Sequence, residues 1–187
     1  MTEILDQIQQ WAHDIGASHT RIITDRDYLQ VKQSVRDSCL VNACGKSGKS
    51  WTCPPHVGEL SELGDRLLSY PEVIIIQNIT ELEDSWDFEG MTDAQIKHNN
   101  MIRELGKRIT KEYPHCEILI LGCGECGFCE KCNCPDEPCR FPDEALSSVE
   151  GYGLEISSLV ESVGLHYING VNTVSYVGAV LLRCGNS

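Results

Sequence analysis

Cysteine is the residue of this sequence whose number and spacing indicate chemistry. The chain contains 11 cysteines in 187 residues. An odd number of thiols, in a chain whose first residues resemble an acidic amphipathic helix and not an export signal, disfavours a disulfide framework and favours metal binding in a reducing compartment. Nine of the cysteines are candidate metal ligands because they form two compact groups: Cys39, Cys44 and Cys53 in the segment 39–56, and Cys123, Cys126, Cys129, Cys132, Cys134 and Cys139 in the segment 123–142.

The second group contains the pattern C-x2-C-x2-C at Cys126, Cys129 and Cys132. This spacing lets a loop wrap around a cubane cluster, so that successive thiolates reach different irons. A tetrahedral zinc site more often uses two C-x2-C pairs that are separated by a dozen or more residues. The pattern therefore favours a [4Fe–4S] cluster, with zinc as the alternative. Three residues are open as the fourth ligand: Cys123, Cys134 (which precedes Pro135, as in bacterial ferredoxins) and Cys139.

The first group has the spacing Cys39-x4-Cys44-x8-Cys53-Pro-Pro. Beside the second group, it predicts a second cluster with three local ligands. The fourth ligand could come from a spare thiol, Cys123 or Cys134, or from His56. It could also be absent, which would leave an iron open to a substrate or an exogenous ligand. The other five histidines, and the acidic residues Asp143, Glu144, Glu150 and Glu155, are interpreted as structural or surface groups.

The GKS sequence between Cys44 and Cys53 is not a phosphate-binding loop. If Gly48, Lys49 and Ser50 ended such a motif, its first glycine would fall on Ala43. The Pro-Pro pair after Cys53 also forbids the helix that must follow a phosphate loop. We interpret this stretch as a turn between two ligands, in which Lys46 and Lys49 offset the negative charge of a thiolate-bound cluster.

Helices alternate with apolar strands along the rest of the chain. Helices are expected over 3–15, 57–70, 92–113 (with Thr92 as a cap) and 154–163, and strands over 20–24, 72–80, 116–122 and 166–183. We predict an α/β (α+β) fold, in which one mixed sheet of about four to five strands with flanking helices carries a cysteine-rich cofactor lobe. The whole chain, 1–187, is expected to be one domain. The two remaining cysteines, Cys116 and Cys184, begin and end predicted strands and are expected to be small core residues.

The composition excludes several classes of partner. The net charge is -13 and the sequence pI is about 4.8. A strongly acidic chain lacks the basic face that nucleic acids or anionic membranes require, so we expect neither as a partner. No run of about 18 apolar residues is present, and the expected location is the cytoplasm. An acidic surface suits a redox partner protein with a basic docking face; the composition gives no oligomeric state.

The sequence resembles a domain-of-unknown-function family of predicted metal-binding proteins of anaerobic bacteria and archaea. The resemblance covers roughly residues 35–165 and rests on "CGKSGKSWTCPP", "CGFCEKCNCPDEPCRFP" and "SSVEGYGLEI". It implies ligands at Cys44 and Cys53 with Cys39 upstream. It also implies a second set at Cys126, Cys129, Cys132 and Cys139, which favours Cys139 as the fourth ligand. Gly151 and Tyr152 depart from the family's pattern, and Cys123 and Cys134 are additional.

The sequence therefore predicts an iron–sulfur protein with two [4Fe–4S] clusters favoured over one, acting in electron transfer to or from a redox partner in anaerobic metabolism. One alternative is an iron–sulfur enzyme or sensor with an open iron at Cys39, Cys44 and Cys53. Another is a zinc-stabilised interaction module. No residue is assigned a catalytic role.

Overall fold

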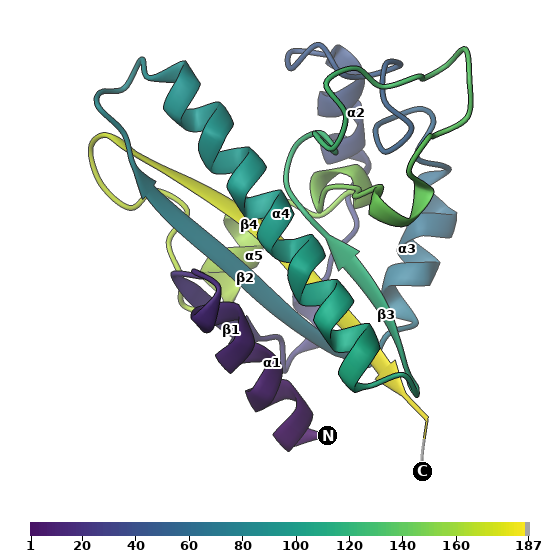
Figure 1. Ribbon diagram of the computed structural model, residues 1–187, viewed down its shortest axis with the longest axis vertical. Coiled ribbons are helices and arrows are strands. Elements are labelled where there is room, and N and C mark those ends of the chain that lie inside the picture. The colour runs from purple at the N-terminus through teal and green to yellow at the C-terminus, as the bar shows by residue number, and fades with distance from the viewer. Residues whose placement is uncertain (186–187) are drawn as a thin grey trace.

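A single four-stranded sheet forms the centre of the structure, which is a computed structural model that describes residues 1–185. The strands are β1 (His19–Ile22), β2 (Glu72–Glu81), β3 (Cys116–Leu121) and β4 (Thr173–Cys184). Their order is β1-β2-β4-β3, and each neighbouring pair is antiparallel (Figure 1). The α/β class that the sequence predicts is confirmed with four strands, but the sheet is antiparallel throughout and not mixed as expected.

The apolar run of β2 is continuous because both faces of this strand are covered. Val73 and Ile75 belong to one hydrophobic core, whereas Ile74 and Ile76 belong to a second core on the opposite face. Successive side chains of a strand point to opposite faces, so a strand buried on both sides cannot alternate apolar and polar residues.

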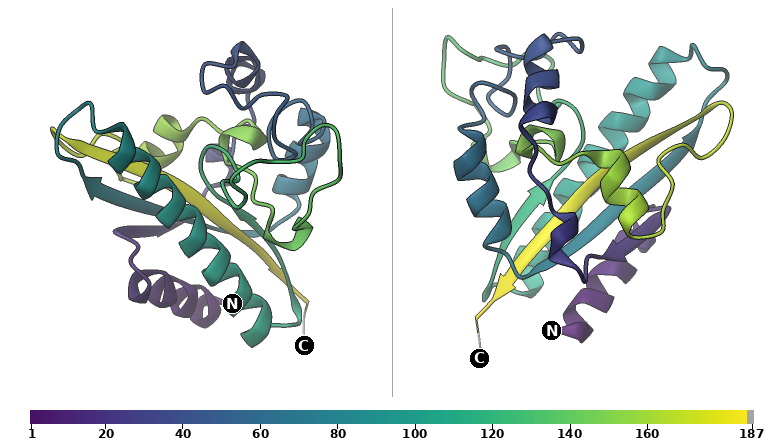
Figure 2. Two further views of the ribbon diagram at one scale, coloured as in Figure 1. Left: turned by 45° about the horizontal axis from the view of Figure 1, so that its top comes forward. Right: turned by 180° about the vertical axis from the view of Figure 1, so that it is seen from behind.

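Helices cover both faces of the sheet. Helices α1 (Thr2–Asp14) and α4 (Phe88–Glu112) pack on the face of Ile74, while α3 (Leu60–Leu68) and α5 (Ile156–Ser162) pack on the face of Ile75. The view from behind shows α5 on the face opposite to α4 (Figure 2). None of the helices within residues 1–185 is long and apolar enough to cross a membrane.

Helix α4 begins four residues before the start predicted from the sequence. The carboxylate of Asp87 accepts a hydrogen bond of 2.8 Å from the backbone N–H of Gly90 and caps the helix. Thr92, which we expected to be the cap, lies inside the helix, and its hydroxyl donates to the Phe88 carbonyl. The acidic connector before residue 92 therefore contains the first turn of α4.

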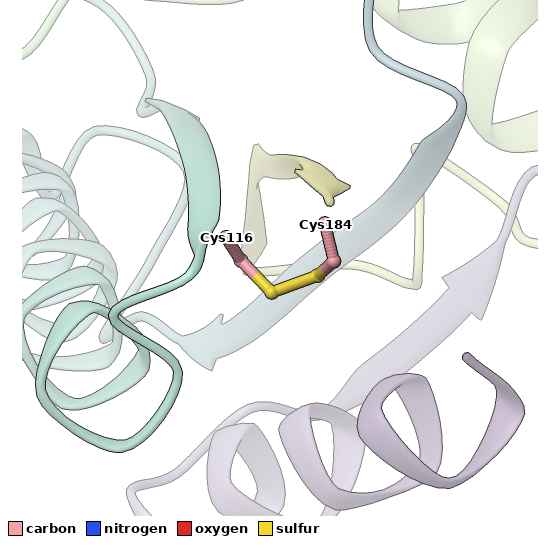
Figure 3. The surroundings of a disulfide bond; sticks show 2 residues. All are labelled: Cys116 and Cys184. Atoms are coloured by element: carbon pink, nitrogen blue, oxygen red, sulfur yellow. A yellow bond between two sulfur atoms is a disulfide. The ribbon is translucent and has the colours of Figure 1, made fainter. Parts of the chain in front are cut away.

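The two cysteines outside the two cysteine groups are joined by a disulfide bond. Cys116 at the start of β3 lies directly opposite Cys184 at the end of β4, and their Cα atoms are 4.0 Å apart (Figure 3). Cys116 is buried and Cys184 packs against the core, as expected of small core residues, but the sequence did not predict the bond between them. Strand register brings the two thiols together, although they are separated by 68 positions in the sequence.

The cysteine-rich segments lie together at one end of the sheet, beyond the end of β3 (Figure 1). Helix α2 (Gln33–Val41) leads into the first segment, and β3 leads directly into the second. Short 3-10 helices occur at Arg26–Tyr28, Pro142–Glu144 and Glu150–Tyr152. The disulfide lies at the opposite end of β3, so it is separated from these segments by the length of that strand.

Candidate metal centre

The first cysteine segment is a loop that closes on itself. Cys39 lies in the last turns of α2, and Asn42 ends this helix in the left-handed conformation with φ 63°. Further along, the Pro54 carbonyl accepts hydrogen bonds from the N–H of Gly48, at 2.8 Å, and from the hydroxyl of Ser47, at 3.1 Å. These bonds return the chain toward its starting point, so that Cys44 and Cys53 face a common space with Cys39. The GKS stretch forms the turn in this loop, as interpreted from the sequence.

This common space is a cavity of about 310 Å³. We call it the three-cysteine cavity because Cys39, Cys44 and Cys53 line it. Glu150, from the 3-10 helix Glu150–Tyr152, lines it as well. The cavity therefore combines three sulfur donors and a carboxylate, which are donor types that iron and zinc both accept.

Helix α4 fixes the start of the second cysteine segment with polar side chains spaced four residues apart. Asn99 donates to the carbonyls of Cys123 and Glu125, at 3.0 Å each, and accepts from the N–H of Cys123 at 3.0 Å. Gln95, one turn earlier, also donates to the Cys123 carbonyl. Gly122 permits this close approach, since a Cβ atom there would lie 2.3 Å from the Asn99 side-chain oxygen.

Arg103 continues this polar row and reaches a candidate ligand directly. Its guanidinium donates to the carbonyls of Glu144 and Cys126, and one nitrogen lies 3.3 Å from the Cys126 sulfur. The side chain is only 5% exposed and lies over the ring of Phe128. A buried cation beside a thiolate stabilises its negative charge.

The second segment encloses another cavity of about 310 Å³. We call it the five-cysteine cavity because five cysteines line it: Cys126, Cys129, Cys132, Cys134 and Cys139. Lys46, Thr52 and Glu125 line both cavities, so the two are immediate neighbours. The structure thus brings together the C-x2-C-x2-C cysteines with two of the three residues that the sequence left open as fourth ligand.

Direct contacts hold the two loops against each other. Lys46 of the first loop forms an ion pair of 2.6 Å with Glu125 of the second. The indole N–H of Trp51 donates to the Glu137 carbonyl at 3.0 Å. The Cys134 thiol lies 3.9 Å from the Gly48 carbonyl. A group bound in one cavity would therefore lie next to a group bound in the other.

Two candidate ligands are not among the residues that line either cavity. Cys123 is buried against α4, and its sulfur lies 3.5 Å from the Asn99 side-chain oxygen. His56 packs edge-on against Trp51, with ring centres 5.1 Å apart. The placement of both residues is set by contacts with neighbouring side chains.

Burial controls the ionisation of the groups around the three-cysteine cavity. It raises the pKa of Cys53 to about 11, and burial followed by the nearby Glu150 raises that of Cys39. Burial likewise raises the pKa of Glu150, although hydrogen bonds from Ser148 and from backbone groups act to lower it. A metal must therefore displace protons from these thiols when it binds.

A separate group of metal-ligand types occurs at the disulfide. The ligand atoms of His115, Cys116 and Cys184 all lie within 4.8 Å of one another. We expected His115 to be structural, and its neighbours are bonded to each other, so this trio becomes a possible His/Cys/Cys metal site only when the disulfide is reduced.

The fold and these two cavities define an α/β protein with two adjacent cysteine-lined cavities that are candidate metal sites. The chain belongs to the family described as predicted metal-binding protein (DUF2284), whose sequence model matches residues 22–182. The match includes both cysteine segments and confirms the resemblance seen in the sequence. No curated protein and no solved structure matches the chain.

Proposed function

We propose that this chain is an iron–sulfur protein that binds two [4Fe–4S] clusters and transfers electrons to or from a partner protein. The observation that carries the proposal is the pair of adjacent cavities, one with three cysteines and one with five. In the second cavity, Cys126, Cys129, Cys132 and Cys139 are the proposed ligands. In the first, Cys39, Cys44 and Cys53 supply three. Adjacent centres permit electron exchange between them.

The spacing of the donor atoms supports a cluster over a single zinc ion. Four thiolates around one zinc at about 2.3 Å place their sulfurs about 3.8 Å apart. Among residues 1–185, only His115, Cys116 and Cys184 bring three ligand atoms within 4.8 Å of one another, and these lie outside both cavities. The wider spacing of the cavity cysteines, around about 310 Å³ of space, suits a larger polynuclear group.

The protein's own residues would tune such centres. Arg103 provides a cation beside Cys126, and the pair of Lys46 and Glu125 closes the boundary between the cavities. Hydrogen bonds and charges near cluster sulfurs set the reduction potential. A bound cluster would supply a one-electron couple.

The surface and the thiol content support the remaining parts of the proposal. A net charge of -13 favours a partner with a basic docking face. Nine free cysteines suit the reducing interior of an anaerobic cell, so we propose a cytoplasmic location.

A second candidate function is an iron–sulfur enzyme or sensor. It is favoured by the count of three cysteines in the three-cysteine cavity, against five in its neighbour. A centre with three thiolates keeps one coordination position for a weaker ligand, and a substrate or signal molecule can take that position.

Anaerobic purification followed by iron, acid-labile sulfide and zinc analysis tests the proposal. We expect about eight irons and about eight sulfides per chain, as two [4Fe–4S] clusters contain. Cys44→Ser and Cys129→Ser should each lose about half of this iron. The matched control, Cys184→Ser, removes a disulfide-bonded cysteine far from both cavities and should lose none. A colourless protein with stoichiometric zinc and no sulfide would show that the chain is a zinc-stabilised module instead.

A further inference from the structure

Glu150 lines the three-cysteine cavity and has a carboxylate oxygen without a hydrogen-bond partner. The residue as a whole is partly exposed, but its Oε2 atom is buried and has no hydrogen-bond partner. No lysine, arginine or histidine within the described residues 1–185 forms an ion pair with it. Glu150 lines the cavity together with Cys39, Cys44 and Cys53.

Such an arrangement is costly unless a cation completes it. A buried oxygen without a partner loses the hydrogen bonds that water would give it, and a buried negative charge loses much more. The other acidic residue on this cavity, Glu125, is paired with Lys46 at 2.6 Å. The contrast between the two residues indicates that the partner of Glu150 is a group that binds inside the cavity.

The other candidates for a fourth donor, Cys123, Cys134 and His56, do not line this cavity. Cys123 is held against Asn99 of α4 and does not line the cavity. Cys134 lines the five-cysteine cavity, and His56 packs against Trp51. Glu150 is therefore a side chain that lines the cavity and also has an unpartnered carboxylate oxygen.

We propose that Glu150 supplies the fourth protein donor to the metal centre held by Cys39, Cys44 and Cys53. This inference rests on the proposed function, because it assumes that the cavity holds an iron–sulfur cluster. A carboxylate is a harder donor than a thiolate, so it binds the iron of a cluster less tightly than a thiolate does. An iron bound by Glu150 would differ from three irons bound by thiolates, and it would be the site at which a small anionic or oxygen-donor ligand could replace the carboxylate.

The test compares Glu150→Gln with two matched variants. Glu150→Gln preserves the size of the side chain and removes the anionic donor. Glu125→Gln changes the other acidic residue on the same cavity, and Cys123→Ser removes the competing thiol. Each protein is purified anaerobically, exposed to a mild oxidant such as ferricyanide, and analysed for iron, sulfide and EPR signals.

We expect Glu150→Gln to lose about one iron of the eight in two [4Fe–4S] clusters and to show the EPR signal of a [3Fe–4S] cluster. The wild type, Glu125→Gln and Cys123→Ser should keep that iron under the same treatment. Glu150→Asp, which retains a carboxylate, should retain more of it than Glu150→Gln. Mössbauer spectra of 57Fe-labelled wild type should show one distinct iron site, which is absent from Glu150→Gln.

The outcomes separate this inference from the proposed function. If the wild type contains no iron and sulfide, both are wrong. If the wild type contains two clusters and Glu150→Gln keeps all of its iron and the distinct site, only the role of Glu150 is wrong. Loss of iron from Cys123→Ser, with Glu150→Gln unaffected, would assign the fourth position to the thiol.

Discussion

Arg103 should raise the reduction potential of the proposed cluster at Cys126 more than that of the other proposed cluster. Its guanidinium lies 3.3 Å from the Cys126 sulfur, and no hydrogen bond from Arg103 reaches the first cysteine group in the described structure. Reduction adds one negative charge to a cluster. A nearby cation stabilises the reduced form more than the oxidised form, so its removal should make the potential more negative.

The magnitude follows from this geometry. With the cluster centre beyond the sulfur, the guanidinium and the added charge are about 6 Å apart, which at an effective dielectric constant of ~20 is worth about 3 kcal/mol. For a one-electron couple this energy equals about 120 mV. Because the added charge is spread over the cluster, we expect Arg103→Met to shift the potential by about 50–100 mV in the negative direction.

Anaerobic redox titration followed by EPR measures this shift. Lys107→Met is the matched control, because Lys107 lies one turn further along α4 and pairs with Glu144 at the surface. It should move neither potential by more than about 10 mV, since exposed charges are strongly screened. Arg103→Lys should fall between the wild type and Arg103→Met. Arg103 does not tune the cluster at Cys126 if Arg103→Met keeps its iron and both potentials are unchanged, or if both clusters shift equally.

Three further predictions concern protons and the disulfide. Since burial raises the pKa of Cys53 to about 11, Co²⁺ binding by the apoprotein should strengthen at least about tenfold per pH unit between about pH 6 and 8. Spectrophotometric titration should show a shallower slope for Cys53→Ala. Burial lowers the pKa of His98 to about 3. As the pH falls, His98 is therefore protonated in the unfolded chain before it is protonated in the folded one. The free energy of unfolding should consequently fall by roughly 1.4 kcal/mol for each pH unit below about 6.5. Urea unfolding of His98→Gln should lack this slope. The double variant Cys116→Ser/Cys184→Ser removes the disulfide, which joins residues with a sequence separation of 68. It should lower the free energy of unfolding of the apoprotein by up to about 4 kcal/mol. Urea unfolding measures this loss, and an unchanged unfolding midpoint would contradict it.

Those features that depend on local sequence were predictable. The β-branched run at Val73–Ile76 predicts a strand covered on both sides, and the structure confirms it. The C-x2-C-x2-C spacing predicts that Cys126, Cys129 and Cys132 converge, and all three line one cavity. Neither conclusion requires knowledge of distant contacts.

The remaining features depend on tertiary contacts that no local pattern contains. Cys116 and Cys184 meet because of the register between β3 and β4. Glu150 is one of 28 acidic residues, and only the packing of α2 and the second loop around it makes it distinctive. The sequence contained only a weak indication that Asn99 and Arg103 are functional, because these two polar residues, four positions apart, interrupt the apolar face of the predicted helix. Asp87 was missed as a cap because the acidic stretch before α4 contains several equivalent residues.

An anaerobic crystal structure with anomalous maps at the iron and zinc edges tests the central claim most directly. We expect two separate iron peaks, one enclosed by Cys39, Cys44 and Cys53 and the other by Cys126, Cys129, Cys132 and Cys139. Each peak should be extended, as a cluster of several irons requires. A single compact peak at the zinc edge in either cavity, with none at the iron edge, would contradict the account.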